Sequence, residues 1–160
     1  MFVDSSEFNR VVDKYTDVVF RSALSFCKSK SDAEDITQNA FMKLLKTEVD
    51  FESDDHIRKW LVRVVANESK SLWRSFWQRK VISFEDLDYE PEYMDPEKGE
   101  IFAEIMKLPK KYCTVLHLYY YEGYKCNEIA PVLGISESNV QTRLMRARNM
   151  LKDKLGEAWI

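Results

Sequence analysis

The sequence predicts an all-α protein that is divided into two small helical domains. Glycine and proline occur only four times each among 160 residues, which leaves long stretches without a helix breaker. Apolar residues recur at helical spacing in the first half and again in the second. The segment between them is acidic and contains Pro91 and Pro96, which interrupt regular structure. We therefore expect domains at residues 1–80 and 99–160, joined by a flexible acidic linker at 81–98.

The first two predicted helices are amphipathic. One covers residues 7–28, where the apolar face consists of Phe8, Val11, Val12, Tyr15, Val19, Phe20, Ala23 and Cys27. The next begins at a capping box made by Ser31 and Glu34, and its apolar face consists of Ala33, Ile36, Ala40, Phe41, Leu44 and Leu45. The opposite face carries Asp35, Gln38, Asn39 and Met42. That face is either plain solvent surface or a docking surface for a partner.

A polar loop from Asp50 to His56 precedes a long basic helix that ends near Lys80. The predicted buried stripe of this helix consists of Leu61, Val64, Val65, Leu72 and Phe76. A polar set falls elsewhere on the helix and consists of Arg63, Asn67, Lys70, Ser71 and Arg74. Trp60, Trp73 and Trp77 are expected to pack against other helices rather than to stack on bases.

The second half contains the pattern of a helix-turn-helix. A helix is expected from Pro109 to Gly123. The motif follows, with a small residue at the helix crossing, a glycine at the turn and apolar residues between the helices: Ile129, Ala130, Leu133, Gly134, Ile135 and Val140. Ser136 is the expected N-cap of the last helix, and Pro131 is expected to distort the helix before it.

The last predicted helix has a buried side and a polar side. Leu144, Ala147 and Leu151 follow Val140 on the buried side. The opposite side presents candidates for contact with base edges, namely Ser138, Gln141, Thr142, Met145 and Arg146. Arg143 and Arg148 flank them, where phosphate contact is expected. The alternative is an antiparallel helix pair with a solvated basic face.

Charge is segregated along a chain whose net charge is -3. Residues 56–80 hold seven basic side chains against one acid, and residues 81–104 hold nine acids against one lysine. Residues 135–160 are basic again. This pattern predicts two basic surfaces separated by an acidic connector, which is either a solvated linker or a segment with a partner of its own.

No catalytic or metal-binding pattern is present in the sequence. Cys27, Cys113 and Cys126 show no paired spacing and are expected to be small apolar residues on helices. His56 and His117 have no second ligand at helical spacing. We therefore predict no enzyme activity, cofactor, metal or small-molecule substrate. We find no bilayer-spanning apolar run and no signal peptide, so we expect no membrane insertion and a cytoplasmic protein.

Three segments together resemble a known family. They are "SDAEDITQNAFMKLL", "DFESDDHIRKWLVRVVANESKSLWR" and "LPKKYCTVLHLYYYEGYKCNEIAPVLGISESNVQTRLMRARNML". In this order they resemble the core-binding, promoter-opening and minus-35-recognising regions of bacterial RNA polymerase sigma factors. The resemblance is to the small two-domain extracytoplasmic-function (ECF) type and covers nearly the whole chain. It implies that the protein binds core RNA polymerase and promoter DNA, and that an anti-sigma factor restrains it.

The resemblance also implies a role for each set of residues. Docking on the polymerase clamp helices falls to Asp35, Gln38, Asn39 and Met42. In the minus-10 element, one base is flipped out of the strand. The resemblance implies that this element is contacted by Phe51, Ser53, Asp54, His56, Arg63, Asn67, Lys70, Ser71 and Arg74. Contact with minus-35 falls to Ser138, Gln141, Thr142, Arg143, Met145, Arg146 and Arg148. The acidic connector is implied to thread a basic channel of the polymerase.

The sequence departs from the family pattern at two places. Glu52, Asp54 and Asp55 make the predicted loop more acidic than a strand-capturing surface is expected to be. Asn139 and Gln141 stand where relatives commonly carry threonine and a basic residue, so the minus-35 sequence does not transfer. The alternative function is a stand-alone helix-turn-helix regulator, whose first half would serve for dimerisation or sensing.

Overall fold

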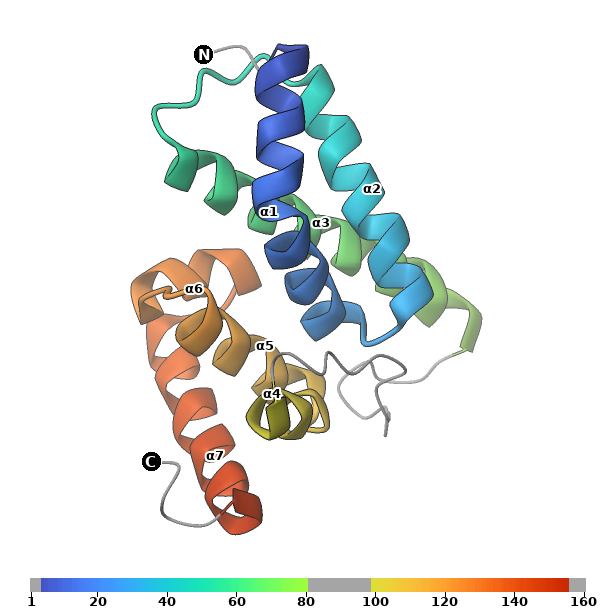
Figure 1. Cartoon of the computed structure of the whole chain (residues 1–160). Helices are drawn as coiled ribbons and strands as arrows, with labels where there is room; N and C mark the ends of the chain where they lie inside the picture. The colour runs from blue at the N-terminus through green and yellow to red at the C-terminus, as the bar shows by residue number, and fades with distance from the viewer. Residues whose placement is uncertain (1–3, 81–98, 156–160) are drawn as a thin grey trace.

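The computed structural model describes residues 4–80 and 99–155, and it is helical throughout its regular elements (Figure 1). The first half contains α1 (Ser5–Cys27), α2 (Lys30–Lys46) and α3 (Asp54–Lys80). The second half contains α4 (Gly99–Met106), α5 (Lys110–Leu116), the π-helix η2 (His117–Tyr121), α6 (Cys126–Leu133) and α7 (Glu137–Leu155). The all-α prediction is confirmed. The predicted linker at 81–98 lies outside the described residues.

Helix caps set the first two helices. The Asp4 carboxylate accepts a hydrogen bond from the Glu7 backbone N–H at 2.8 Å and starts α1. Lys28 ends α1 in the left-handed region, with φ 60°. The predicted capping box at Ser31 is wrong, because Ser29 is the N-cap of α2 and accepts from the Asp32 N–H at 3.3 Å. Ser29 keeps extended backbone angles, whereas Ser31 already lies in the first helical turn.

Helix α3 begins earlier than the sequence predicted. The Ser53 hydroxyl accepts from the His56 N–H at 3.1 Å, so Asp54 and His56 lie in the first turn and not in a loop. Leu72, expected in the core, has 38% of its surface exposed. Its helical position is on the side of Leu61, but the C-terminal end of α3 projects past α2 in Figure 1. Leu45, also expected in the core, is 48% exposed.

The three helices of the first half enclose one apolar core. It is built mainly from Val11, Val19, Ala23, Leu24, Ala33, Ile36, Ala40, Leu44, Leu61, Val62, Val65 and Ala66. Most of these residues belong to the apolar faces that the periodicity predicted. Cys27 and Cys113 are buried and Cys126 is half-buried, and all three are free thiols. Burial raises the pKa of Cys113 to about 11, so this thiol packs as an apolar group.

The helix-turn-helix is formed by α6 and α7. Gly134 occupies the left-handed region at φ 70°, which a residue with a Cβ adopts only with strain, and its N–H donates to the Ala130 carbonyl. The Ser136 hydroxyl accepts from the Asn139 N–H at 3.0 Å, which confirms it as the cap of α7. Helix α6 continues through Pro131 to Leu133. The predicted helix after Pro109 is confirmed, although it ends in the π-helical turn η2.

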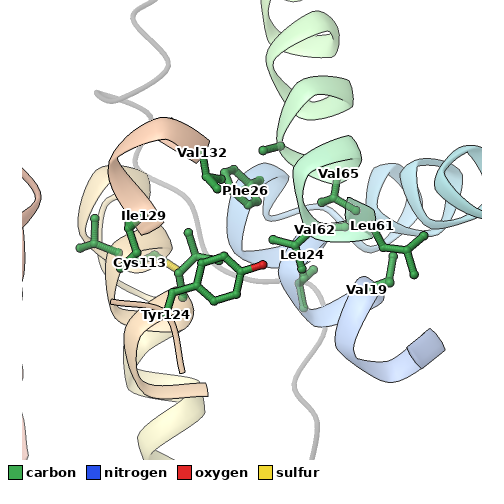
Figure 2. Close-up of a cluster of buried hydrophobic side chains, with 14 of the residues drawn as sticks. Val19, Leu24, Phe26, Leu61, Val62, Val65, Cys113, Tyr124, Ile129 and Val132 are labelled. Atoms are coloured by element: carbon green, nitrogen blue, oxygen red, sulfur yellow. The ribbon is translucent and has the colours of Figure 1, made fainter. Parts of the chain in front are cut away.

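The two halves pack against each other. Helices α5 and η2 contact α1, and α6 contacts α3, while α7 packs on α4, α5 and α6 (Figure 1). In Figure 2, Phe26 of α1 lies beside Val132 of α6, and Tyr124 extends toward Leu24 and Val62. We call this contact region the junction. It brings together residues that are far apart in the sequence.

Candidate nucleic-acid and partner interfaces

Helix α7 has a buried side and an open side, as predicted. Val140, Leu144, Ala147 and Leu151 are buried. Among the candidate base contacts, Ser138, Gln141, Met145 and Arg146 are exposed, whereas Thr142 is half-buried and donates its hydroxyl hydrogen to the Ser138 carbonyl at 3.1 Å. The open side starts at the N-terminal end of the helix. This is the geometry with which a recognition helix enters the major groove.

The two flanking arginines of α7 are held by other residues. The Arg148 Nε donates to the Tyr120 hydroxyl at 2.8 Å, and its guanidinium lies over the Tyr119 ring at 5.3 Å. The Arg143 Nε lies 3.4 Å from the Asn139 side-chain oxygen. The two tyrosines that position Arg148 were not predicted as site residues. Their only trace in the sequence is the run "LYYY" just before Glu122.

The predicted minus-10 face of α3 is a single polar stripe. The stripe consists of Arg63, Asn67, Lys70 and Ser71, which follow one another at spacings of four, three and one residue. Lys70 is half-buried and the other three are exposed. This spacing places all four on the side opposite the core residues of α3. Arg74 continues the series, but its side chain lies outside the described part of the chain.

The segment before α3 is more closely packed than a strand-capturing loop. Phe51 is buried at 3% exposure, with its ring edge-to-face with the rings of His56 at 5.1 Å and Trp60 at 5.6 Å. Phe51 is therefore closed off from solvent in this arrangement, because its ring completes the core beneath the start of α3. The expected packing of Trp60 is confirmed. Ser53 and Glu52 remain exposed.

Asp54 forms ion pairs with two basic side chains of α1. Its carboxylate lies 2.8 Å from the Arg10 Nη2 and 2.8 Å from the Lys14 Nζ. Hydrogen bonds from these two cations hold the pKa of Asp54 well below its usual range. The acidic character that departed from the family pattern is thus partly neutralised by α1. His56 is also engaged, because its Nδ1 accepts from the Glu52 backbone N–H at 3.1 Å.

The outer face of α2 combines polar and apolar groups. Asp35, Gln38 and Asn39 are exposed, and Met42 is 50% exposed. Leu45, which the periodicity assigned to the core, adds a second exposed apolar side chain. A groove of about 490 Å³ between α1 and α2 opens beside them and is lined by Thr16, Phe20, Lys30, Glu34, Thr37 and Gln38. Exposed apolar side chains beside a groove are typical of a protein-docking surface.

The junction contains a largely buried cluster of ionisable side chains that the sequence did not predict. We call Arg21, Arg58, His117 and Glu122 the junction cluster. The Arg58 Nη1 donates to the Glu122 carbonyl at 2.9 Å and lies 3.3 Å from its Oε2. The His117 Nε2 lies 3.3 Å from the Glu122 Oε1 and 3.2 Å from the Ser22 hydroxyl. Arg21 and Arg58 come from the first half, and Glu122 and His117 from the second.

Electrostatics within the junction cluster favour the charged carboxylate. Burial opposes ionisation of Glu122, but the adjacent His117 imidazole and the charges of Arg21 and Arg58 outweigh it and lower its pKa. The Arg58 guanidinium also lies over the Tyr124 ring at 5.4 Å. A buried charge set of this kind depends on all its members, because removal of one leaves another charge without compensation.

Some buried polar atoms at the junction lack hydrogen-bond partners among the described residues. Arg21 Nε, His117 Nδ1 and the Tyr124 hydroxyl are buried without a hydrogen-bond partner among the described residues. A polar atom in this state costs about 1–3 kcal/mol relative to its hydrated state. The Glu122 Oε1 also makes no well-aligned hydrogen bond, although His117 is close to it. The junction therefore combines strong attraction with an appreciable desolvation cost.

Comparison with known proteins gives the family. The Sigma-70 region 2 model matches residues 11–79, and the Sigma-70 region 4 model matches residues 98–151. The chain belongs to the sigma-70 family. The two matches occupy the two halves of the fold in the order that the sequence indicated.

Similar proteins place the chain in the ECF group. It is 28% identical over 141 residues to the RNA polymerase sigma factor SigV of Bacillus subtilis, covering 85% of this chain and 83% of SigV. It is 29% identical over 153 residues to the ECF sigma factor SigM of the same organism, covering 90% and 92%. The protein is thus an ECF-type, promoter-directing sigma factor and not an enzyme.

Solved structures support the same fold. The sigma factor RpoE of Bartonella quintana, in complex with the anti-sigma factor NepR, superposes with a TM-score of 0.70 at 19% identity, covering 95% of this chain and 98% of RpoE. CnrH, in complex with the cytosolic domain of CnrY, superposes with a TM-score of 0.62 at 25% identity, covering 95% of this chain and 89% of CnrH.

No helix among the described residues has the length and apolar character needed to cross a bilayer.

Proposed function

We propose that this sigma factor binds core RNA polymerase with its first half and recognises a promoter through one helix of each half. The observation that carries the proposal is the pair of polar faces on α3 and α7, each opposite a side of its helix that packs into the apolar core. In this division, residues 1–80 bind the polymerase and the minus-10 element, and residues 99–160 bind minus-35. Residues 81–98 form the acidic connector between them.

The outer face of α2 is the proposed polymerase surface. Gln38, Asn39 and Met42 present amide groups and an apolar side chain to solvent on one side of the helix. Leu45 extends the apolar part by one further position. Binding of a helical partner would bury this exposed apolar area, which favours association.

The two DNA surfaces take different parts in promoter recognition. On α3, Asn67 and Ser71 supply hydrogen-bonding groups for an unstacked base, and Arg63 supplies a cation for the strand backbone. On α7, Gln141 and Arg146 face the major groove, where a bidentate contact discriminates between bases. Arg148, held by the two tyrosines, supplies a fixed phosphate contact.

We further propose an anti-sigma factor as a partner and the cytoplasm as the place of action. The support is that both solved structures named above are complexes, one with an anti-sigma factor and one with the cytosolic domain of CnrY. The seven acids at 81–98 support a role for the connector in a basic channel of the polymerase. Replacing Glu85, Asp86, Asp88, Glu90 and Glu92 with neutral residues is expected to weaken polymerase binding or initiation.

Run-off transcription tests the proposal. The purified chain is added to core RNA polymerase on a template that carries the promoter upstream of its own gene. We expect a defined transcript that core polymerase alone does not make. Met42→Asp should abolish it by preventing association with core, which gel filtration measures directly.

The matched control is Met145→Asp, an equally exposed methionine on α7. It should leave association with core unchanged and affect promoter recognition alone. If the wild-type chain yields no new transcript, or if Met145→Asp is the variant that loses core, the assigned surfaces are incorrect.

A further inference from the structure

A cavity of about 150 Å³ lies where α3, α5 and α7 approach one another. Its charged lining residues are all basic and come from these three helices: Lys70, Lys110, Lys111 and Arg143. Within the part of the chain that the structure describes, no acid lines this cavity. The walls also include the apolar side chains of Phe26, Leu133 and Ile135. The cavity therefore combines charges of one sign with partly apolar walls.

A cavity of this kind attracts anions. Charges of one sign in a cleft raise the local concentration of counter-ions, and apolar walls strengthen the attraction because they lower the local dielectric constant. All four basic residues are half-buried, so each keeps part of its surface accessible to solvent. A dissolved anion can therefore reach them.

Two of the four cations are positioned by contacts with neighbouring groups. The Lys70 Nζ donates to the Val132 carbonyl at 3.1 Å. The Arg143 Nε lies 3.4 Å from the Asn139 side-chain oxygen. An ammonium has three N–H donors and a guanidinium has five, so each of these contacts uses only one of several donors.

The Cys113 thiol is subject to the same positive potential. Burial raises its pKa, and the charges of Lys28 and Lys110 act in the opposite direction. Lys28 is buried, and its Nζ donates to the carbonyl of Leu108, two residues before Lys110. A fifth cation thus adds positive charge next to the α5 wall of the cavity.

We propose that this cavity binds a phosphate group, either as inorganic phosphate or as part of a small phosphomonoester. A phosphomonoester carries a charge of about −1.5 to −2 at pH 7. Its oxygens accept hydrogen bonds from a guanidinium fork and from ammonium groups alike. The cavity has the volume of roughly five water molecules in the liquid, which suits a single phosphate group.

The cavity is distinct from the two proposed DNA faces. Lys70 and Arg143 were expected to contact DNA, but Lys110 and Lys111 belong to neither face. Phe26, which lines the cavity, is only 1% exposed. A phosphate within a DNA strand carries a sugar on each side, whereas a space of this size holds little more than the phosphate itself. The geometry therefore favours a small ligand, and the site does not depend on promoter recognition.

Titration of the full-length chain with sodium phosphate tests the site, with sodium chloride at the same ionic strength for comparison. We expect saturable changes in the Lys111 and Thr114 amide NMR signals with phosphate alone. The melting temperature should also rise, because the anion binds the folded chain and not the unfolded one. Lys110→Gln combined with Lys111→Gln should weaken phosphate binding by about tenfold.

Lys152→Gln is the matched control, because it removes an exposed lysine of the same half that does not line the cavity. Its affinity for phosphate should equal that of the wild type. Arg143→Gln removes a cation from a different helix and should weaken binding by a similar factor. It decides the matter if the double lysine variant fails to fold.

A parallel titration with AMP distinguishes the two sources of phosphate. Tighter binding of AMP than of inorganic phosphate identifies a phosphomonoester as the ligand. Equal or weaker binding of AMP identifies inorganic phosphate. The connector variant described above is titrated in the same way, because its acids could compete for the four cations.

Three outcomes overturn the inference. Signal changes that chloride reproduces would mean general screening of charge. Equal phosphate affinity in the wild type, the double lysine variant and Arg143→Gln would place the anion elsewhere. Binding that appears only in the connector variant would mean that the connector itself occupies the cavity. Failure of the proposed function is separate, since it is measured by run-off transcription and leaves these titrations unchanged.

Discussion

Helices α3 and α7 carry similar polar faces but differ in what surrounds them. The open side of α7 presents Gln141 and Arg146 to solvent. The stripe of α3 borders a contact edge at which Arg58, Lys59 and Lys70 are bound by the second half. The two helices thus differ in which half of the molecule engages their basic side chains, although their sequences are equally basic. The difference shows that tertiary contact, and not charge alone, decides how a basic side chain is engaged.

The largest expected effect comes from an apolar contact between α1 and α6 that joins the two halves. Phe26 is 1% exposed and lies beside Val132 of α6 (Figure 2). Phe26→Ala should lower the free energy of unfolding by about 3–5 kcal/mol and separate the halves. Urea denaturation and the radius of gyration measure the two effects. Duplex minus-35 binding by α7 should persist in the folded variant.

Leu44→Ala is the control for Phe26→Ala, because Leu44 is equally buried but lies in α2 away from the second half. It should cost about 2–5 kcal/mol without any change in the radius. If both variants expanded the chain equally, Phe26 would have no particular role at the junction.

The next effect concerns α7 alone. Arg146→Ala should reduce discrimination between the correct minus-35 sequence and a mutated one by about 1–3 kcal/mol, because a bidentate base contact is lost. Competition binding by the holoenzyme measures it. Arg10→Ala, at an exposed site of α1, should leave discrimination unchanged. Loss of core binding in Arg146→Ala would contradict the assignment of this face.

A smaller effect is expected at the start of α7. Ser136→Ala removes the acceptor of the Asn139 N–H and should cost about 1 kcal/mol. Ser31→Ala in α2 is the informative comparison, since the sequence suggested a cap there and the structure shows none. It should change the melting temperature little. Equal losses in the two variants would restore Ser31 as a cap.

The smallest effect at neutral pH is the titration of Glu122. Its pKa is lowered while the two halves are in contact, because Arg21, Arg58 and His117 face it at the junction. An exposed glutamate has a pKa of about 4.3. The Glu122 carboxylate therefore contributes fully to the association of the two halves above about pH 4.3. This contribution is lost as the pH falls through the lowered pKa. The radius should rise in acid below about pH 4, and Glu122→Gln should not show this dependence.

Periodicity predicted much of the fold because each helix buries one continuous face. It succeeded for Val140, Leu144, Ala147 and Leu151 on α7, where spacing alone defines the buried side. It failed for Leu72 of α3, because burial there depends on where the neighbouring helix ends. It made no prediction for Phe51, since an aromatic residue in a polar segment gives no periodic pattern.

The junction was beyond prediction for a different reason. Its members are far apart in the sequence, as Ser22 and His117 are at a separation of 95 residues, and each lies in a segment with an ordinary pattern. A single acid after an aromatic run, such as Glu122, does not indicate which basic side chains it meets. The sequence therefore predicted the two polar faces but not the contact between the two halves.

The π-helical turn η2 holds one residue more between His117 and Glu122 than an α-helical turn would. The Glu122 N–H donates to the His117 carbonyl five residues earlier at 3.1 Å, which brings these two side chains to the same side. Deleting one residue among 118–121 would place Glu122 four residues after His117, and in an α-helix residues at this spacing also share a face. The His117–Glu122 pair is thus expected to tolerate a one-residue deletion in this turn, because the turn can change from π-helical to α-helical spacing.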